Sequence, residues 1–232
     1  MKLCLTAACA AVLALAVPAA ASAATFVPQP PKPCYRSGEK VNLAGTGFTP
    51  SVVGGVTVAS DNPDFTGGQL SSDATGAVLG ELTLGQASGR RTSTYTATDT
   101  TNPALTASTQ LTVSAVEVGV RPKGGRPGRR VRIGATGFTT GKSLWVHVRK
   151  RGFKRDFKIG RLKGPCKRLV GKTRILPRGA AVGVYRVQFD TFRRYKKSRE
   201  VRALFTITVT RTFRGATAAS ASALSTRWDR LL

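Results

Sequence analysis

The chain has 232 residues, of which 41% are hydrophobic, and its 37 Lys and Arg against 11 Asp and Glu give a formal net charge of +26. With one histidine, few carboxylates and no C-x-x-C or paired-histidine motif, the composition leaves little for acid–base catalysis or zinc binding. We therefore expect no catalytic residues, no metal, no cofactor and no small-molecule substrate.

The N-terminus has the pattern of a secretory signal peptide. Met1-Lys2 is a short basic start, Leu3 to Val17 is mostly apolar, and Ala21-Ser22-Ala23 resembles a cleavage site. The apolar run is too short to span a membrane, and no later stretch approaches the required length. We expect residues 1–23 to be removed and the chain to be extracytoplasmic, either secreted or associated with the cell wall.

The rest of the chain contains an internal repeat. Residues 38–49 align with residues 128–139 at an offset of 90, and the same offset places Tyr95 over Tyr185. A repeat of about 90 residues is too long for a solenoid unit and suits tandem sandwich domains. The expected domains are residues 24–115 and 116–210.

Within each repeat, apolar residues alternate with polar ones. This period of two predicts strands that bury one face, and Gly, Pro, Asn and Asp clusters separate them at turn-like spacing. The clearest apolar sets are Leu82 and Leu84, Leu111 and Val113, Leu144, Val146 and Val148, and Tyr185, Val187 and Phe189. We predict an all-β protein of two tandem immunoglobulin-like β-sandwiches with about seven short strands each.

Residues 37–48, and their counterpart ending at Gly137-Phe138, resemble the start of a bacterial immunoglobulin-like domain of the IPT/TIG kind, in which a G-x-x-V-x-L/I strand runs into a G-x-G/N-F turn. Gly183-Val184-Tyr185 is similar to the start of strand F in such sandwiches, whereas the first repeat reads Ser93-Thr94-Tyr95. The resemblance implies an extracytoplasmic binding or spacer module, usually without catalysis.

Two aromatic pairs have expected structural roles. Phe48 and Phe138 should plug the sandwich cores. Tyr95 and Tyr185 should each anchor a turn through the hydroxyl, as tyrosine corners do. A cluster in the first repeat offers calcium ligands, but its spacing is not that of an EF-hand and it more often marks turns; it comprises Asp61, Asn62, Asp64 and Asp73.

Cys34 and Cys166 are the two cysteines beyond the signal peptide, and they occupy non-equivalent places in the repeats. Cys34 precedes the second strand of its repeat, and Cys166 falls in a connection at the opposite pole of a sandwich. Those two poles meet when such domains follow one another, and export favours oxidation. An interdomain disulfide is therefore expected, with two free thiols or an intermolecular bridge as alternatives.

Charge separates the two repeats. Residues 24–115 carry five Lys and Arg and six Asp and Glu, whereas residues 116–210 carry 27 Lys and Arg and four Asp and Glu. A GC-rich gene would enrich arginine in both halves, yet the second half also holds ten lysines. A surface of mixed sign would serve solubility with less self-repulsion. The second repeat is therefore expected to meet an anionic partner.

The expected anion-binding surface combines basic loops with interleaved aromatics, which is typical of polyanion binding without specifying the polymer. Trp145 should face outward on a strand, unless it lies under a loop or against the other domain. His147, with no carboxylate neighbour in sequence, should be a surface histidine. The expected site residues are Trp145, Arg149, Arg151, Lys154, Arg155, Arg186, Arg194, Tyr195, Lys196 and Lys197.

The sequence thus favours a non-enzymatic envelope or secreted protein whose basic second domain holds an anionic cell-wall polymer, an acidic polysaccharide or another extracellular polymer. Nucleic acid and anionic membrane surfaces are further candidates. The alternative is a structural or adhesive spacer held at the wall by diffuse charge. Residues 211–232, rich in Ala, Ser and Thr, are expected to form a flexible tail.

Overall fold

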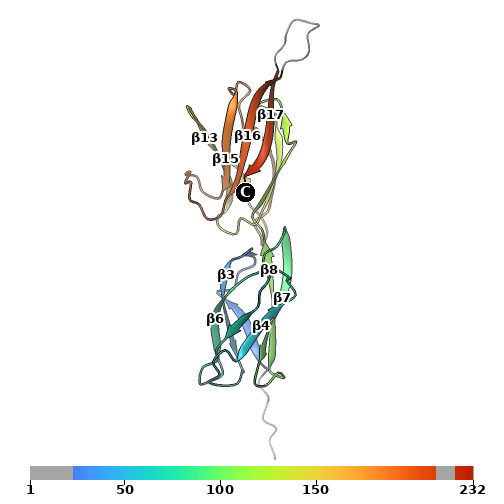
Figure 1. Cartoon of the computed structure of the whole chain (residues 1–232). Coiled ribbons are helices and arrows are strands. Elements are labelled where there is room, and N and C mark those ends of the chain that lie inside the picture. Colours follow the sequence, from blue (N-terminus) through green and yellow to red (C-terminus); the bar gives the residue numbers. More distant parts are fainter. Residues whose placement is uncertain (1–22, 213–222, 232) are drawn as a thin grey trace, which may run out of the picture.

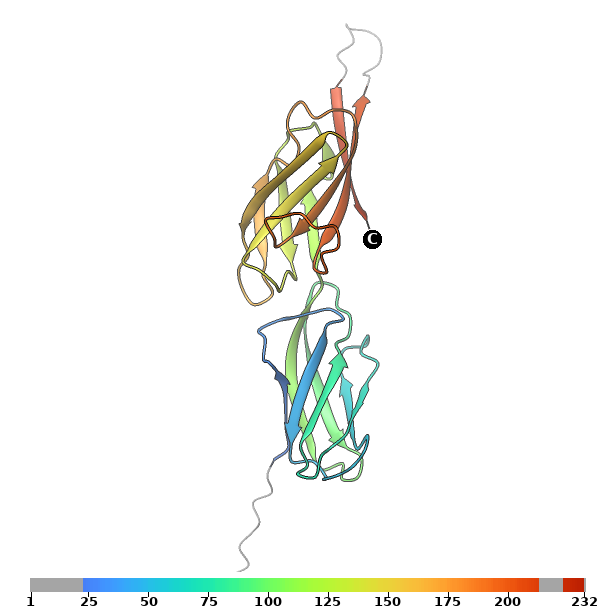
Figure 2. The same ribbon diagram turned by 90° about the vertical axis from the view of Figure 1, so that its left-hand side faces the viewer.

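The computed structural model describes residues 23–212 and 223–231. These residues form two β-sandwiches that follow one another end to end along the long axis of the molecule (Figures 1 and 2). The described part of the chain contains strands and no helix, which confirms the predicted all-β class. The expected signal peptide lies outside the described residues except for Ala23. No helix in the described segments is long and apolar enough to cross a membrane.

The first domain contains β1 to β8 in two sheets. One sheet has the order β1 (Thr25–Gln29), β3 (Lys40–Thr46) and β6 (Val78–Thr83). The other has the order β2 (Tyr35–Arg36), β8 (Thr106–Ser114), β7 (Arg90–Asp99), β4 (Val56–Ser60) and β5 (Gly68–Leu70). Pairing is antiparallel except between β2 and β8.

The second domain contains β9 to β17, also in two sheets. The small sheet has the order β14 (Leu169–Thr173), β11 (Val131–Thr136) and β9 (Glu117–Arg121). The large sheet has the order β10 (Gly124–Gly125), β17 (Ala223–Leu231), β16 (Ala203–Thr212), β15 (Gly183–Asp190), β12 (Ser143–Lys150) and β13 (Phe153–Arg161).

Each domain has its own hydrophobic core, built by the predicted alternation. On β12, Leu144, Val146 and Val148 are fully buried. Phe48 and Phe138 are also buried, so both Gly-Phe motifs insert an aromatic ring into the sandwich as expected. Gly137 has a φ of 77°, and a Cβ there would lie 1.9 Å from the carbonyl oxygen of Ala115. The motif in the second domain therefore needs glycine at this position, because the backbone of the interdomain linker leaves no room for a side chain.

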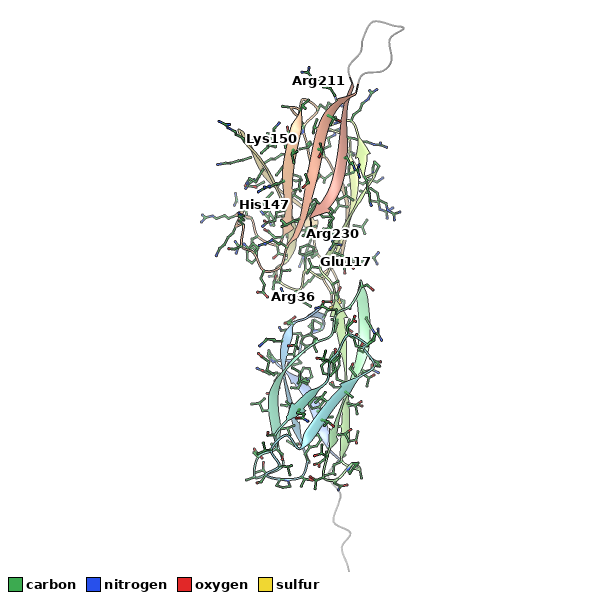
Figure 3. All side chains as sticks on the ribbon, viewed as in Figure 1. Arg36, Glu117, His147, Lys150, Arg211 and Arg230 are labelled. Carbon is green, nitrogen blue, oxygen red and sulfur yellow. A yellow bond between two sulfur atoms is a disulfide. The ribbon has the colours of Figure 1, made fainter. Side chains whose placement is uncertain are left out.

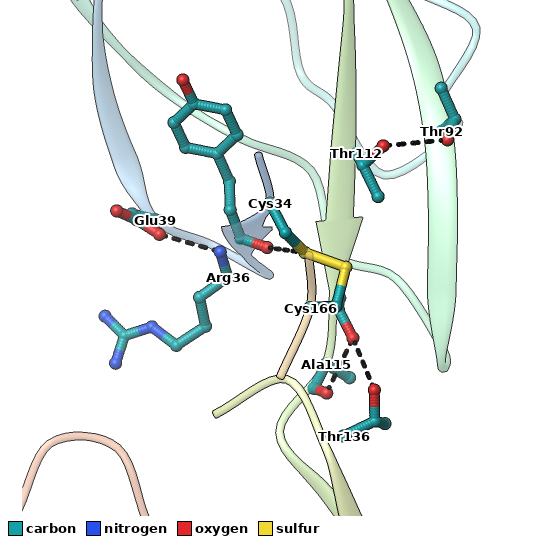
Figure 4. Close-up of a disulfide and its surroundings, with 10 residues drawn as sticks. Cys34, Arg36, Glu39, Thr92, Thr112, Ala115, Thr136 and Cys166 are labelled. Atoms are coloured by element: carbon teal, nitrogen blue, oxygen red, sulfur yellow. Dashed lines mark hydrogen bonds between the residues drawn. A yellow bond between two sulfur atoms is a disulfide. The ribbon is translucent and has the colours of Figure 1, made fainter. Parts of the chain in front are cut away.

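The domain junction is short and covalently closed. Only residues 115–116 separate β8 from β9, and a disulfide joins Cys34 to Cys166, the interdomain pair expected from the sequence (Figure 4). Arg36 also forms an ion pair with Glu200, and the amide of Gly89 donates to Oε1 of Glu117 at 2.9 Å. The two domains are thus joined at several points around the linker.

The prediction of a flexible tail over residues 211–232 is wrong for its last part. Ala223–Leu231 forms β17, which pairs antiparallel with β16 from Leu204↔Leu231 to Thr212↔Ala223. Residues 213–222 lie outside the described part. The composition of this segment resembles a linker, but the open edge of β16 offers a row of unpaired amides and carbonyls that a strand satisfies.

The two aligned tyrosines differ in what their hydroxyls do. The Tyr185 hydroxyl donates to the carbonyl of Ala181 at 2.7 Å, as a tyrosine corner should. The buried Tyr95 hydroxyl lies beside Ser60, Asn62 and Gly85 and makes no such bond to the chain immediately before it, so the tyrosine-corner prediction is wrong for Tyr95. Tyr185 is the third residue of β15, whereas Tyr95 is the sixth of β7. The chain upstream of Tyr95 is therefore already strand and offers no free turn carbonyl.

This difference makes Tyr185→Phe and Tyr95→Phe a matched pair. We expect Tyr185→Phe to lower the free energy of unfolding of its domain by about 1 kcal/mol, the usual net value of one hydrogen bond. The loss stays small because Nζ of Lys150 still donates to the carbonyl of Ala181. Tyr95→Phe should lower the free energy of unfolding by less than Tyr185→Phe does, or should raise it. Urea unfolding followed by circular dichroism measures both, and equal losses would contradict the assignment.

Candidate anion-binding surface of the second domain

Three cations lie in one row across the outer face of the large sheet. Arg149 on β12 is paired with Lys154 on β13 on one side and with Arg186 on β15 on the other. Like charges directly opposite each other in a sheet are destabilising. Asp156 relieves part of the repulsion, because its Oδ1 lies 2.6 Å from Nη1 of Arg149. Lys154 and Arg186 have no ion-pair partner in the described part of the chain.

The loop formed by residues 191–202, between β15 and β16, folds over this face. The Tyr195 ring centroid lies 4.4 Å from the Arg149 guanidinium and 5.7 Å from the His147 ring. The Gln188 side chain on β15 donates to the carbonyl of Lys196 at 3.0 Å. Gln188, which should face outward by alternation, does lie on the outer face but is buried because this loop covers it.

His147 is fully buried under the loop, so the expectation of a surface histidine is wrong. Its Nδ1 lies 2.8 Å from Oδ1 of Asp156 on β13, and its Nε2 lies 3.2 Å from Oδ1 of Asp190 on β15. Nε2 also lies 3.1 Å from the carbonyl oxygen of Phe192. Asp156 and Asp190 are 9 and 43 residues away in the chain, so only strand pairing brings these carboxylates to the ring.

The surroundings of His147 favour the imidazolium form. Burial lowers the pKa, but hydrogen bonds to Asp190 and Asp156, together with their charges, outweigh it and raise the pKa of His147 above its ordinary 6.5. Both ring nitrogens face acceptors, and both must then carry a proton. A ring whose two nitrogens are occupied and which solvent does not reach has a structural role: it links β13, β15 and the loop.

This raised pKa predicts a pH dependence of stability. A group whose pKa is raised on folding stabilises fully below its unfolded pKa, near 6.5, and that stabilisation is lost as pH rises through the folded pKa. Burial raises the pKa of Asp156, but Arg149 and His147 outweigh burial and hold this pKa below its ordinary 3.8. Asp156 therefore adds stability that is lost as pH falls below 3.8. The free energy of unfolding should therefore decline on the alkaline side of 6.5.

The measurement is unusually clean because the chain has one histidine. Its ring proton resonance should titrate above pH 6.5, in step with the decline in stability. A resonance that titrates below that value would contradict the buried imidazolium.

A groove opens between the loop and the sheet, with a volume of about 320 Å³. We call it the loop groove. Its Lys and Arg side chains are Arg149, Arg186, Lys197 and Arg202, the buried His147 ring also borders it, and among the residues whose side chains are described no carboxylate lines it. Tyr195, Val184 and Leu204 give it apolar surface. The arrangement suits a ligand with anionic groups and an apolar body.

Four of the ten predicted site residues line the loop groove: Arg149, Arg186, Tyr195 and Lys197. Arg202, Val184 and Leu204 were missed. The alternation could have found them, because Arg202 and Leu204 flank buried Ala203, and Val184 precedes buried Tyr185. Trp145 lies half-buried on the outer face but does not line the groove. Arg194 and Lys196 are exposed on the loop, and Arg151 is exposed in the β12–β13 turn.

The remaining predicted pair, Lys154 and Arg155, lines a second groove of about 700 Å³ together with Arg174 and Arg178. Arg155 does not share the outer face: its Nη1 donates to the carbonyl of Ile175 at 3.2 Å, and its guanidinium lies 4.7 Å from the Phe157 ring centroid. We call this the distal groove because the β12–β13 hairpin lies toward the end of the second domain farther from the first (Figure 3).

The acidic cluster of the first domain serves its own turns. The Asp73 carboxylate accepts hydrogen bonds from the amides of Thr75 at 2.8 Å and Ala77 at 3.0 Å, and Asn62 accepts one from the amide of Asp64. The described residues contain no group of three side chains that could hold a metal ion.

Comparisons with known proteins give no family assignment. No protein-family model and no curated protein matches this chain. Among solved structures, the chain is similar to the crystal structure of a tetra-tandem repeat in the extending region of a large adhesion protein, at 14% identity and a TM-score of 0.25. The match covers 90% of this chain and 65% of that one.

Proposed function

We propose that the protein is a non-enzymatic extracytoplasmic binding protein, and that its second domain holds an anionic polymer in the loop groove. The observation that carries this proposal is a groove lined by four Lys and Arg side chains and, among the described side chains, by no carboxylate. Lys and Arg that neutralise the charges of a polyanion release its counterions, which supplies most of the affinity.

The charge balance of the second domain supports the proposal. Its four carboxylates within residues 116–210 all have internal partners: Glu117 accepts from Gly89, Asp156 and Asp190 hold His147, and Glu200 pairs with Arg36. These acids stabilise the fold and the junction, and they leave Arg186 and Lys197 without an ion pair in the described part of the chain. An external anion would relieve the repulsion among these cations.

A second candidate is a structural or adhesive spacer that diffuse charge retains at an anionic wall. The short linker and the disulfide favour it, because they limit bending between the domains. In this case the first domain, near-neutral by sequence, would set the reach of the molecule.

Charge-matched variants of the whole protein separate the two candidates. Arg186→Gln with Lys197→Gln removes two cations of the loop groove. Arg132→Gln with Lys172→Gln removes two exposed cations that are paired across β11 and β14 on the small sheet. Binding to wall teichoic acid, an acidic polysaccharide, DNA and anionic liposomes is measured across a salt series.

We expect the groove variant to lose about tenfold in affinity at about 0.15 M salt, and the small-sheet variant much less. Equal losses would favour diffuse retention. Absence of binding by the unaltered protein to every probe would reject an anionic partner altogether.

A further inference from the structure

We propose that the ligand is a linear acidic polysaccharide that occupies both grooves at once, with the distal groove as its second binding subsite. This inference rests on the proposed function, because the loop groove is the first subsite. It adds a subsite of four cations, Lys154, Arg155, Arg174 and Arg178, none of which lines the loop groove.

The distal groove gathers charge from two separate segments. Lys154 and Arg155 come from the start of β13, and Arg174 and Arg178 come from the connection between β14 and β15. Among the described residues no carboxylate lines the groove, and the carboxylates within residues 116–210 have their partners elsewhere. Lys154, Arg174 and Arg178 form no ion pair in the described part of the chain, so no internal anion compensates their mutual repulsion.

The distal groove is also partly pre-organised. The hydrogen bond to Ile175 and the contact with Phe157 hold the Arg155 guanidinium in place, so less side-chain entropy is lost when it binds an anion. Phe153, Leu176 and Pro177 supply apolar surface beside the cations. The Phe153 ring is itself fixed, since it packs edge-on against Tyr185 with 5.6 Å between ring centroids.

A continuous row of cations connects the two grooves. Lys154 lines the distal groove and is the cross-strand partner of Arg149, which lines the loop groove and is in turn paired with Arg186. Neighbouring strands lie about 4.8 Å apart, so Lys154 and Arg186 flank Arg149 at close, regular intervals across the sheet, and Asp156 neutralises part of the Arg149 charge. A chain with an anionic group on successive units can follow this row from one groove to the other.

The loop groove favours sugar rings over nucleic-acid bases, and the one aromatic ring of the distal groove among the described residues, Phe153, is half-buried against Tyr185. A base needs an open aromatic face on which to stack. Two aromatic side chains, Tyr195 and Phe205, line the loop groove among the described residues. Tyr195 already has the Arg149 guanidinium 4.4 Å from its ring centroid, and Phe205 is buried and packs edge-on against Phe189. Val184, Leu204, Leu176 and Pro177 instead offer aliphatic surface for the C–H faces of sugars.

The test is a length series of oligogalacturonates, from the dimer to the polymer, titrated against the whole protein. Arg174→Gln with Arg178→Gln removes two exposed cations of the distal groove, and Arg132→Gln with Lys172→Gln is again the charge-matched control. Tryptophan fluorescence during urea unfolding checks that the second domain stays folded, because both tryptophans, Trp145 and Trp228, belong to its strands.

We expect affinity to rise by about 10²-fold or more once an oligomer reaches both grooves, as for two linked sites. The distal variant should lose this gain and leave binding of short oligomers unchanged, whereas the control should keep the gain. If short oligomers bind but the gain survives in the distal variant, the second subsite is wrong and the proposed function stands. If no oligomer or polymer binds, the proposed function fails in its polysaccharide form. A single-stranded DNA series that binds more tightly and depends on the distal pair would overturn the choice of polysaccharide.

Discussion

Leucine in place of His147 is expected to lower the free energy of unfolding of the second domain by about 3–5 kcal/mol, the usual cost of leaving a buried charge without its partner. Asp190 is fully buried, and His147 is its only cationic contact among the described residues. The Gln188 side chain and the Phe192 amide would still donate to Asp190, at 2.7 and 2.8 Å, but neither carries a charge.

Urea unfolding followed by tryptophan fluorescence measures this cost in the second domain alone, since Trp145 and Trp228 both lie there. The control is the double variant His147→Leu with Asp190→Asn, which removes the uncompensated charge and should recover a large part of the loss. A cost below about 1 kcal/mol, the level of an exposed ion pair, would show that Asp190 is not a buried anion. A double variant as unstable as the single one would assign the loss to packing.

The sequence predicts the architecture well because alternation is a local signal. The alternate positions of Leu144, Val146 and Val148 predict one buried face whichever strands lie beside them, and these residues are buried. The same holds for Tyr185, Val187 and Phe189. The C-terminal strand was not predicted, because Ala223–Leu231 becomes a strand through the open edge of β16 rather than through its own composition. Tyr95 shows the same limit: the residue matches Tyr185, but the longer strand before it leaves no upstream turn carbonyl for its hydroxyl.

The sequence predicts several of the charged residues of the candidate site but not the contacts that they make. Arg149, Arg186 and Lys197 could be chosen because strand phase and basic loops place them on the outer face. The burial of His147 could not be predicted, because it depends on which residues of β13 and β15 stand opposite His147 and on a loop that covers the sheet. The sequence separation of Asp190 from His147 gives no hint of that register.

Removal of the disulfide, by Cys34→Ser with Cys166→Ser, is expected to lower the free energy of unfolding of the second domain by about 4 kcal/mol on a loop-entropy model. While the first domain stays folded, Cys34 and the linker at residues 115–116 are fixed points. Unfolding the second domain then leaves a closed loop of about 50 residues between the linker and Cys166, and its restricted entropy accounts for the stabilisation.

The same bond should set the stiffness of the molecule. Without it, the described junction retains the Arg36–Glu200 ion pair and the Glu117 hydrogen bond to Gly89, and exposed ion pairs contribute about 0–1 kcal/mol. Small-angle scattering should therefore show a wider range of interdomain angles in the cysteine variant than in the unaltered protein. Arg36→Gln with Glu200→Gln is the control, which breaks a junction contact but keeps the covalent link, and it should change neither scattering nor stability by much. A cysteine variant that keeps both its unfolding free energy and its scattering profile would mean that the two-residue linker alone fixes the domains. Because the linker is so short and Gly137 packs against it, such a result would assign the rigidity of the molecule to the linker packed on Gly137 and not to the disulfide.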